Sequence, residues 1–240
     1  LVFSFAGRRL ISALDWEAPS LFESPHGLAL NVLAQFDLNG GAENLNSQYL
    51  SFKFNFSPLP GIYARAGGTL GFTEYRAGAE MEGETNLALN LGLDWALAGT
   101  PEDVLSFGLI WASGEAGNSS PLSFHSITLL SPSGVLSAGI GGLAVLQGSY
   151  TIRPRENLSL GMNCRYYFRG NLNTIDTLPL VAEKWKRALG GENSGSVIWI
   201  PAADISVTWG GGVFFPALGN AVQRNTPSRW KTMLSLAFSI

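Results

Sequence analysis

Apolar and polar residues alternate with a period of two along most of the chain. Residues 28–38 place leucine, valine and phenylalanine at even positions and asparagine, glutamine and aspartate among the odd ones. The same alternation recurs in residues 50–56, 87–97, 158–169 and 230–240. Successive side chains of a strand point to opposite faces, so each segment predicts a β-strand with one apolar and one polar face.

The length of these segments favours strands that cross a membrane. Soluble strands average about five to six residues, whereas a barrel strand needs about 9–11 to cross a bilayer. The apolar faces end in aromatic residues such as Trp95, Trp111, Phe168 and Trp230, and barrels in lipid carry aromatic girdles at both interfaces. A soluble β-sandwich or lipocalin-like barrel also alternates and is the alternative.

The connections alternate between short and long, as do the periplasmic turns and external loops of outer-membrane barrels. The predicted short turns are residues 57–61, 98–103, 154–157 and 201–204. The predicted long loops are residues 39–46, 75–85, 114–139, 170–190 and 217–228. This phase gives about ten strands from Gly27 onward, and residues 1–16 offer an eleventh. Single-chain bacterial barrels are usually even-numbered, so either that first segment lies outside the barrel or a partner strand is undetected.

These patterns together predict an all-β fold, a closed antiparallel up-and-down transmembrane β-barrel of about 10–12 strands. Residues 1–240 form a single barrel, with residues 1–26 as an N-terminal segment that is either an extra strand or a truncated start. The chain begins at Leu1 without an initiator Met, which fits a mature or truncated product. A spanning helix at residues 134–152 is the rival interpretation, but five glycines weaken it.

The composition argues against several classes of function. Only 14% of the residues are charged, against about 25% in a typical soluble domain, and a net charge of −3 gives no reason to expect nucleic acid. The single Cys164 excludes an intramolecular disulfide, and His26 and His125 are too far apart in sequence to suggest a metal site. We expect no catalytic residues, no metal and no cofactor, and therefore no enzyme.

The polar face carries the candidate functional residues. Asn31, Gln35, Asn55, Asn90 and Asn163 fall on it by parity. The residues predicted to line a pore are Asp37, Lys53, Arg65, Asp94, Gln147, Arg153, Arg165, Arg169 and Lys231. Six of these are basic and two acidic, which predicts a water-filled lumen biased toward anions. Alternatively, the charges pair with inward-folded loops or fill a narrow, plugged barrel.

The turn at residues 57–61 leads to one prediction about register. Pairing Phe56 with Ile62 across it places Lys53 directly opposite Arg65 on the inner face. Like charges at directly opposite positions destabilise a strand pair. A counter-charge such as Asp37 or Asp94, or an aqueous lumen, would then be needed beside them.

From residue 107 to residue 240 the chain resembles the C-terminal half of alginate-export-type and related porin-like outer-membrane barrels. Residues 111–115, 148–154, 157–168 and 190–216 carry the resemblance. The final strand resembles the assembly signal of barrels, which usually ends in Phe or Trp, whereas this chain ends in Ile240. The resemblance implies a location in the bacterial outer membrane.

The expected function is a channel for passive passage of small hydrophilic, anionic solutes through that membrane. The alternative is an adhesion or structural barrel that acts through its extracellular loops. The expected partners are the lipid bilayer and small solutes. Trp185, with Lys184, Lys186 and Arg187, also offers a loop contact for lipopolysaccharide or glycans, although a solvated loop explains it equally simply.

Overall fold

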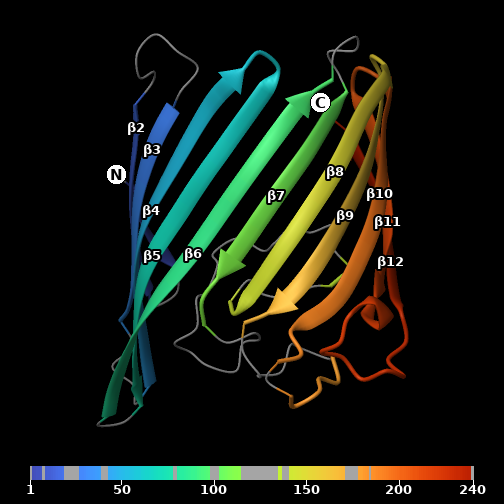
Figure 1. The fold of residues 1–240 in the computed structure, drawn as a ribbon. Coiled ribbons are helices and arrows are strands. Elements are labelled where there is room, and N and C mark those ends of the chain that lie inside the picture. Colours follow the sequence, from blue (N-terminus) through green and yellow to red (C-terminus); the bar gives the residue numbers. More distant parts are fainter. Residues whose placement is uncertain are drawn as a thin grey trace.

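A computed structural model shows twelve β-strands in one sheet (Figure 1). It describes residues 2–6, 9–18, 27–38, 43–77, 80–97, 103–114, 135–136, 141–170, 178–183 and 185–238. Each strand pairs with the next along the chain, and every pair is antiparallel. The fold is therefore the all-β, up-and-down meander that the alternation predicted.

Ten strands follow Gly27, as predicted, and the first segment supplies two more. The strands are β1 (Val2–Ala6), β2 (Arg9–Ala18), β3 (Gly27–Asp37), β4 (Glu43–Leu59), β5 (Ile62–Ala77), β6 (Glu80–Ala96), β7 (Val104–Ala112), β8 (Leu143–Arg155), β9 (Leu158–Arg169), β10 (Ala188–Ala202), β11 (Ile205–Phe215) and β12 (Arg229–Phe238). A short 3₁₀ helix, η1 (Pro216–Leu218), follows β11. Residues 1–16 therefore supply β1 and most of β2, not a single strand.

The predicted long loop at residues 75–85 is wrong. β5 and β6 run for 16 and 17 residues and leave only two residues between them. The sequence concealed this hairpin because polar side chains occupy both of its faces: Thr73 and Glu84 pair on one, Glu74 and Gly83 on the other. Strands of this length exceed the about 9–11 residues needed to cross a bilayer, so this hairpin extends beyond the apolar part of the sheet.

The turn between β4 and β5 is tighter than predicted. β4 continues to Leu59, with a register irregularity after Phe56, and only Pro60 and Gly61 form the turn. Gly61 has a φ of 77°, which glycine adopts without strain, and the Ser57 hydroxyl donates hydrogen bonds to the carbonyls of Leu59 and Ile62.

The tighter turn changes the register. Phe56 pairs with Ala64 and not with Ile62. Lys53 consequently lies opposite Gly67, and Arg65 opposite Asn55. The predicted Lys53–Arg65 juxtaposition is therefore wrong. The other short turns between described strands agree with prediction, because two residues separate β8 from β9 and β10 from β11.

The rival helical interpretation of residues 134–152 does not hold, because β8 occupies residues 143–155. In the part of the chain that the structure describes, no helix is both long and apolar enough to cross a membrane.

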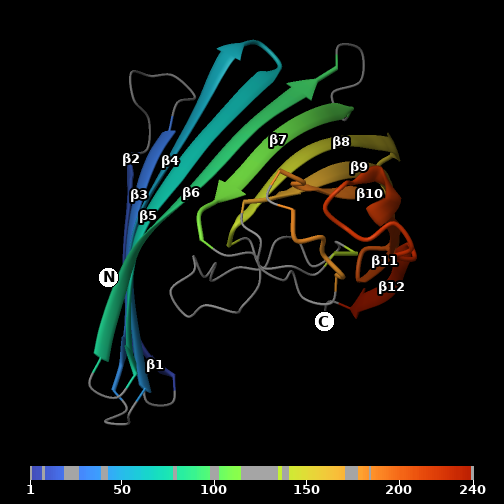
Figure 2. The ribbon, with the colours of Figure 1, turned by 60° about the horizontal axis from the view of Figure 1, so that its bottom comes forward.

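The sheet curves, and its C-terminal strands curl more tightly than its N-terminal ones (Figure 2). β1 and β12 form its two edges, and no described residue of one pairs with the other. The trace leading into β10 lies inside the curve (Figure 2). We call this inner side the concave face.

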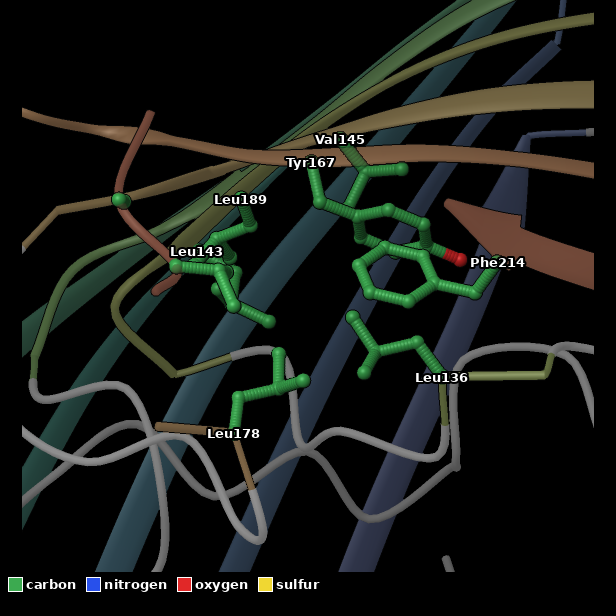
Figure 3. Packing of buried hydrophobic residues seen from close by; sticks show 9 residues of the cluster. Leu136, Leu143, Val145, Tyr167, Leu178, Leu189 and Phe214 are labelled. Atoms are coloured by element: carbon green, nitrogen blue, oxygen red, sulfur yellow. The ribbon is translucent and has the colours of Figure 1, made fainter. Parts of the chain in front are cut away.

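The two faces differ sharply. Large apolar side chains are exposed on the outer face, among them Leu14, Trp16, Leu30, Val32, Leu50, Phe52, Leu70, Leu87, Leu89, Leu91, Leu93, Trp95, Phe107, Leu146, Leu160, Met162, Trp199, Trp209, Trp230, Leu234, Leu236 and Phe238. The concave face is mainly polar, except where Leu136 and Leu178 pack against Val145, Tyr167 and Phe214 (Figure 3). The face assignments that alternation predicted for these strands therefore agree with the structure.

Candidate functional site

Strand register brings predicted residues of three strands, Arg65, Gln147 and Arg165, into one row on the concave face. Arg65 pairs with Gly92, Gly92 with Gly108, and Gly108 with Gln147. Gln147 pairs with Arg165, and Arg165 with Glu192. Residues directly opposite each other in neighbouring strands point to the same face. The row therefore crosses β5 to β10 on the side that a lumen would occupy.

Two glycines in this row give the polar side chains room to lie along the wall. A Cβ on Gly92 would stand 3.1 Å from Nε of Arg65, and one on Gly108 only 2.6 Å from Nε2 of Gln147. A larger residue at either position would push the polar side chain away from the sheet. The glycines thus keep Arg65 and Gln147 flat against the wall.

In the N-terminal half, the charges of the concave face are open to solvent. Nη2 of Arg65 lies 3.1 Å from Oδ1 of Asp94, and the two side chains are 50% and 25% exposed. Lys53 is also exposed and forms no ion pair with any residue the structure describes; the same holds for Arg153, which lies on β8 in the other half of the sheet. Asp37 lies at the end of β3, where its backbone N–H donates to Oδ1 of Asn46. An exposed ion pair such as Arg65–Asp94 contributes little to stability.

In the C-terminal half, a buried carboxylate organises the site. Glu192 on β10 accepts hydrogen bonds from the Arg165 guanidinium and the Tyr167 hydroxyl, both at 3.2 Å. It also accepts from the backbone N–H groups of Val135 and Leu136, both at 2.9 Å. A buried charge is costly unless it is paired and hydrogen-bonded, and these four donors compensate for it. They also fasten residues 135–136 to the concave face.

The sequence analysis missed Glu192. Its outward-facing neighbours on β10 are Gly191, Asn193 and Gly195, none of which is a large apolar residue. Without apolar contrast, alternation does not assign the faces of this strand. The available signal was the two-residue spacing of Glu192, Ser194 and Ser196, read together with the register of β9.

Arg169 has a different environment from the other predicted residues. It is 2% exposed, and its Nε donates to the carbonyl of Lys186 at 2.9 Å. Its Nη2 donates to the carbonyls of Val181 and Glu183 at 2.6 and 3.2 Å. Arg169 therefore holds the segment that leads into β10 against the end of β9.

A recess of about 390 Å³ opens beside this network. Most of its polar lining is neutral and comes from β8 to β11, with one cation at each side. The lining residues with polar side chains are Ser149, Thr151, Asn163, Arg165, Ser194, Ser196, Thr208 and Lys231. The structure thus brings two predicted residues, Arg165 and Lys231, to the edge of one hollow.

No metal-binding cluster of three His, Cys, Asp or Glu side chains occurs in the described ranges. His26 and His125, considered above as metal ligands, lie outside the described residues. Cys164 is exposed and belongs to the face opposite Arg165, as parity predicted.

No family model matches the sequence, and a comparison with curated proteins gives no match. Among solved structures the chain is similar to Pseudomonas aeruginosa OccK11 (OpdR), with 11% identity, a TM-score of 0.56, and coverage of 99% of this chain and 60% of that one. It is also similar to Pseudomonas aeruginosa OccK5 (OpdH), with 11% identity, a TM-score of 0.53, and coverage of 95% and 57%. A NanC porin aligns with 8% identity, a TM-score of 0.43, and coverage of 97% and 94%.

The chain thus spans somewhat more than half the length of the two OccK structures. At this identity the likeness concerns the fold. The structural neighbours are bacterial outer-membrane β-barrel proteins. The chain therefore has the antiparallel β-sheet fold of porin-like outer-membrane barrels.

Proposed function

We propose that the chain forms the wall of a channel that lets small hydrophilic solutes pass through a bacterial outer membrane. One observation carries the proposal: from β2 to β12 the described outer face exposes large apolar side chains while the concave face carries mainly polar ones. A sheet with these two faces suits lipid on one side and an aqueous lumen on the other.

Outward aromatic residues support this location. Trp16, Trp95 and Trp199 lie near the ends of β2, β6 and β10 at one rim of the sheet, and Trp230 lies near the start of β12 at the opposite rim. Barrels in lipid carry such residues at both interfaces. The fold shared with outer-membrane proteins points to the same location.

The two edges of the sheet matter for whether it closes into a barrel. The outer edges of β1 and β12 present backbone N–H and C=O groups that have no strand partner among the described residues. Lipid cannot satisfy such groups, so spanning sheets are closed. We infer that in the membrane both edges are paired and that residues 1–240 belong to a closed barrel. A relation to the alginate-export type stays a prediction.

We further propose a small preference for anions. Of the six predicted cations, Arg65 and Arg165 are paired with carboxylates and Arg169 is engaged with carbonyls. Lys53 and Arg153 are left exposed on the concave face, where cations favour the passage of anions. The preference rests on fewer charges than composition predicted.

One observation favours the second candidate, an adhesion or structural barrel acting through its loops. A cluster of buried apolar residues, including Leu136, Leu178 and Phe214, fills part of the concave side of the C-terminal half (Figure 3). Beside it, Trp185 is 70% exposed and the ammonium of Lys186 lies 5.0 Å from its ring centre. Such a surface could contact glycans or lipopolysaccharide. Lys184 lies outside the described residues.

Reconstitution in a planar bilayer separates the two candidates. The folded chain, checked by circular dichroism for β-structure, should give discrete conductance steps and a reversal potential in a KCl gradient displaced slightly toward chloride. A folded, inserted protein without conductance would favour the loop-functional barrel. Empty bilayers and heat-unfolded protein serve as controls.

A further inference from the structure

We propose that the recess on the concave face between β8 and β12 is a binding site for a small polyhydroxylated solute, such as a mono- or disaccharide. This inference rests on the proposed channel function, because the recess lies on the concave face that would line the lumen. Its volume of about 390 Å³ falls in the range of about 300–1,000 Å³ typical of small-molecule sites.

Two rows of residues, each paired across neighbouring strands, line the recess. Ser149, Asn163 and Ser194 follow one another across β8, β9 and β10, and Gly212 and Lys231 continue that row. The second row, one step along the strands, consists of Thr151, Gly161, Ser196, Gly210 and Met233. Serine and threonine hydroxyls both donate and accept hydrogen bonds. The wall therefore offers hydrogen-bond donors and acceptors together, as a sugar hydroxyl does.

Glycines make the hollow between these side chains. Gly161 and Gly210 line the recess at concave-face positions of the second row, where a larger residue would fill the space. A Cβ on Gly161 would stand 2.8 Å from the Ser196 hydroxyl oxygen. The hydroxyl thus lies over the glycine, and the backbone forms the floor of the recess.

On its Arg165 side, the recess favours a hydroxylated solute over a simple anion. Arg165 is held by Glu192 at 3.2 Å, so its charge is already balanced. Oδ1 of Asn163 is buried and accepts no hydrogen bond from any described residue. An unmet buried acceptor is costly, and a carboxylate or chloride cannot donate to it. A sugar hydroxyl can do so once the amide turns toward the recess.

The test uses the full chain, folded in detergent micelles, with D-glucose as the probe. Saturation-transfer NMR measures binding without requiring conduction, and block of single-channel current by glucose measures it in the bilayer. The filling variant is Gly210→Leu, since a Cβ there meets nothing closer than the Gly195 carbonyl at 3.7 Å. The matched control is Gly211→Leu: Gly211 also lines the recess, but by register its side chain would point to the outer face, with its Cβ 3.4 Å from the Lys231 carbonyl.

A second variant removes hydrogen-bonding groups without filling the recess. Thr208→Val with Ser196→Ala takes two hydroxyls from the lining while leaving the recess open. We expect Gly210→Leu to weaken glucose binding at least about tenfold by occupying the site. The double variant should weaken it about fivefold or more, in line with a net hydrogen-bond value near 1 kcal/mol. Gly211→Leu should bind as the parent does.

Three results would overturn the proposal: equal glucose binding by the two leucine variants, no loss in the double variant, or displacement of glucose by sodium acetate as effective as by unlabelled glucose. The last result would indicate an anion site. The readouts also separate this site from the channel. Glucose binding without conductance leaves the site standing and removes the channel, whereas conductance without glucose binding does the reverse.

Discussion

The ion pairs Arg65–Asp94 and Arg165–Glu192 share the concave face of one sheet but have very different surroundings. In the N-terminal half, Arg65 is 50% exposed, and Asp94 is the partner the structure gives it. In the C-terminal half, the side chains of Arg165 and Glu192 are 9% and 0% exposed. There Glu192 also holds the backbone of Val135 and Leu136.

This difference shows that the strands alone do not determine the role of an inward charge. Both pairs join neighbouring strands on the same face, Arg165 and Glu192 at directly opposite positions and Arg65 and Asp94 on a diagonal. The segments that return inside the curve, residues 135–136 and 178–183, pack on the C-terminal half. There they convert a water-facing pair into an anchor. We therefore propose that the open wall, β2 to β7, mainly conducts, and that the curled wall, β8 to β12, attaches loop residues and binds solute.

The largest effect should come from removing the anchor. Glu192→Ala leaves Arg165 buried without its carboxylate and releases two backbone N–H groups, so we expect a loss of about 3–5 kcal/mol in unfolding free energy. The matched change in the open wall, Asp94→Ala, breaks an exposed pair and should cost about 1 kcal/mol or less. Urea titration in lipid vesicles, followed by tryptophan fluorescence, measures both. Equal losses would mean that the two halves do not differ as described.

The next effect concerns apolar packing behind that anchor. Phe214 is fully buried and its ring meets that of Tyr167 edge-on, with centroids 6.0 Å apart. Phe214→Ala should cost about 3–5 kcal/mol, as expected for a large aromatic residue removed from a packed core. Phe72 on the outer face of β5 is 41% exposed, and Phe72→Ala should cost clearly less in the same urea titration. A larger loss for Phe72 would contradict the location of the core.

These contrasts also mark what the sequence could predict. Alternation identified the faces of β3 and of the end of β6, because Leu91 and Asn90 differ strongly in polarity. It could not detect the hairpin around Thr73 and Glu84, where both faces are polar. Nor could it place Glu192, whose strand lacks apolar contrast.

The sequence also could not predict which charged side chains form ion pairs. Which cation meets which carboxylate depends on strand register, and a small change in a turn shifts every pair. The turn was predicted to occupy residues 57–61, yet the strand continues to Leu59, so Lys53 and Arg65 are not opposite each other. The sequence therefore predicted the presence of inward cations but not which of them would be neutralised.

A smaller, face-dependent effect tests the open wall itself. Leu91 is 46% exposed on the outer face, and Asn90 beside it points to the concave side. Leu91→Arg should cost about 2–4 kcal/mol if it lies near the bilayer midplane, whereas Asn90→Arg should be mild. Folding yield in vesicles, read from heat-modifiable electrophoretic mobility, compares the two. Similar yields would mean that lipid and water do not contact the faces we assigned.

The smallest expected effect is on ion selectivity, and it compares the open wall with the curled wall directly. Lys53 is exposed on β4 opposite Gly67, with no described ion pair, so Lys53→Gln removes a charge that passing ions can sense. We expect the chloride-to-potassium permeability ratio to fall by about twofold or less, because salt screens an exposed charge. Arg165→Gln removes a cation that Glu192 already balances. It should change selectivity less than Lys53→Gln while lowering stability more, since the buried carboxylate then loses its charged partner. The reversal potential in a KCl gradient and the urea midpoint, measured on the same preparations, give both quantities. A larger selectivity change in Arg165→Gln would place the conducting path along the curled wall, and the open wall would then serve mainly as a membrane-facing surface.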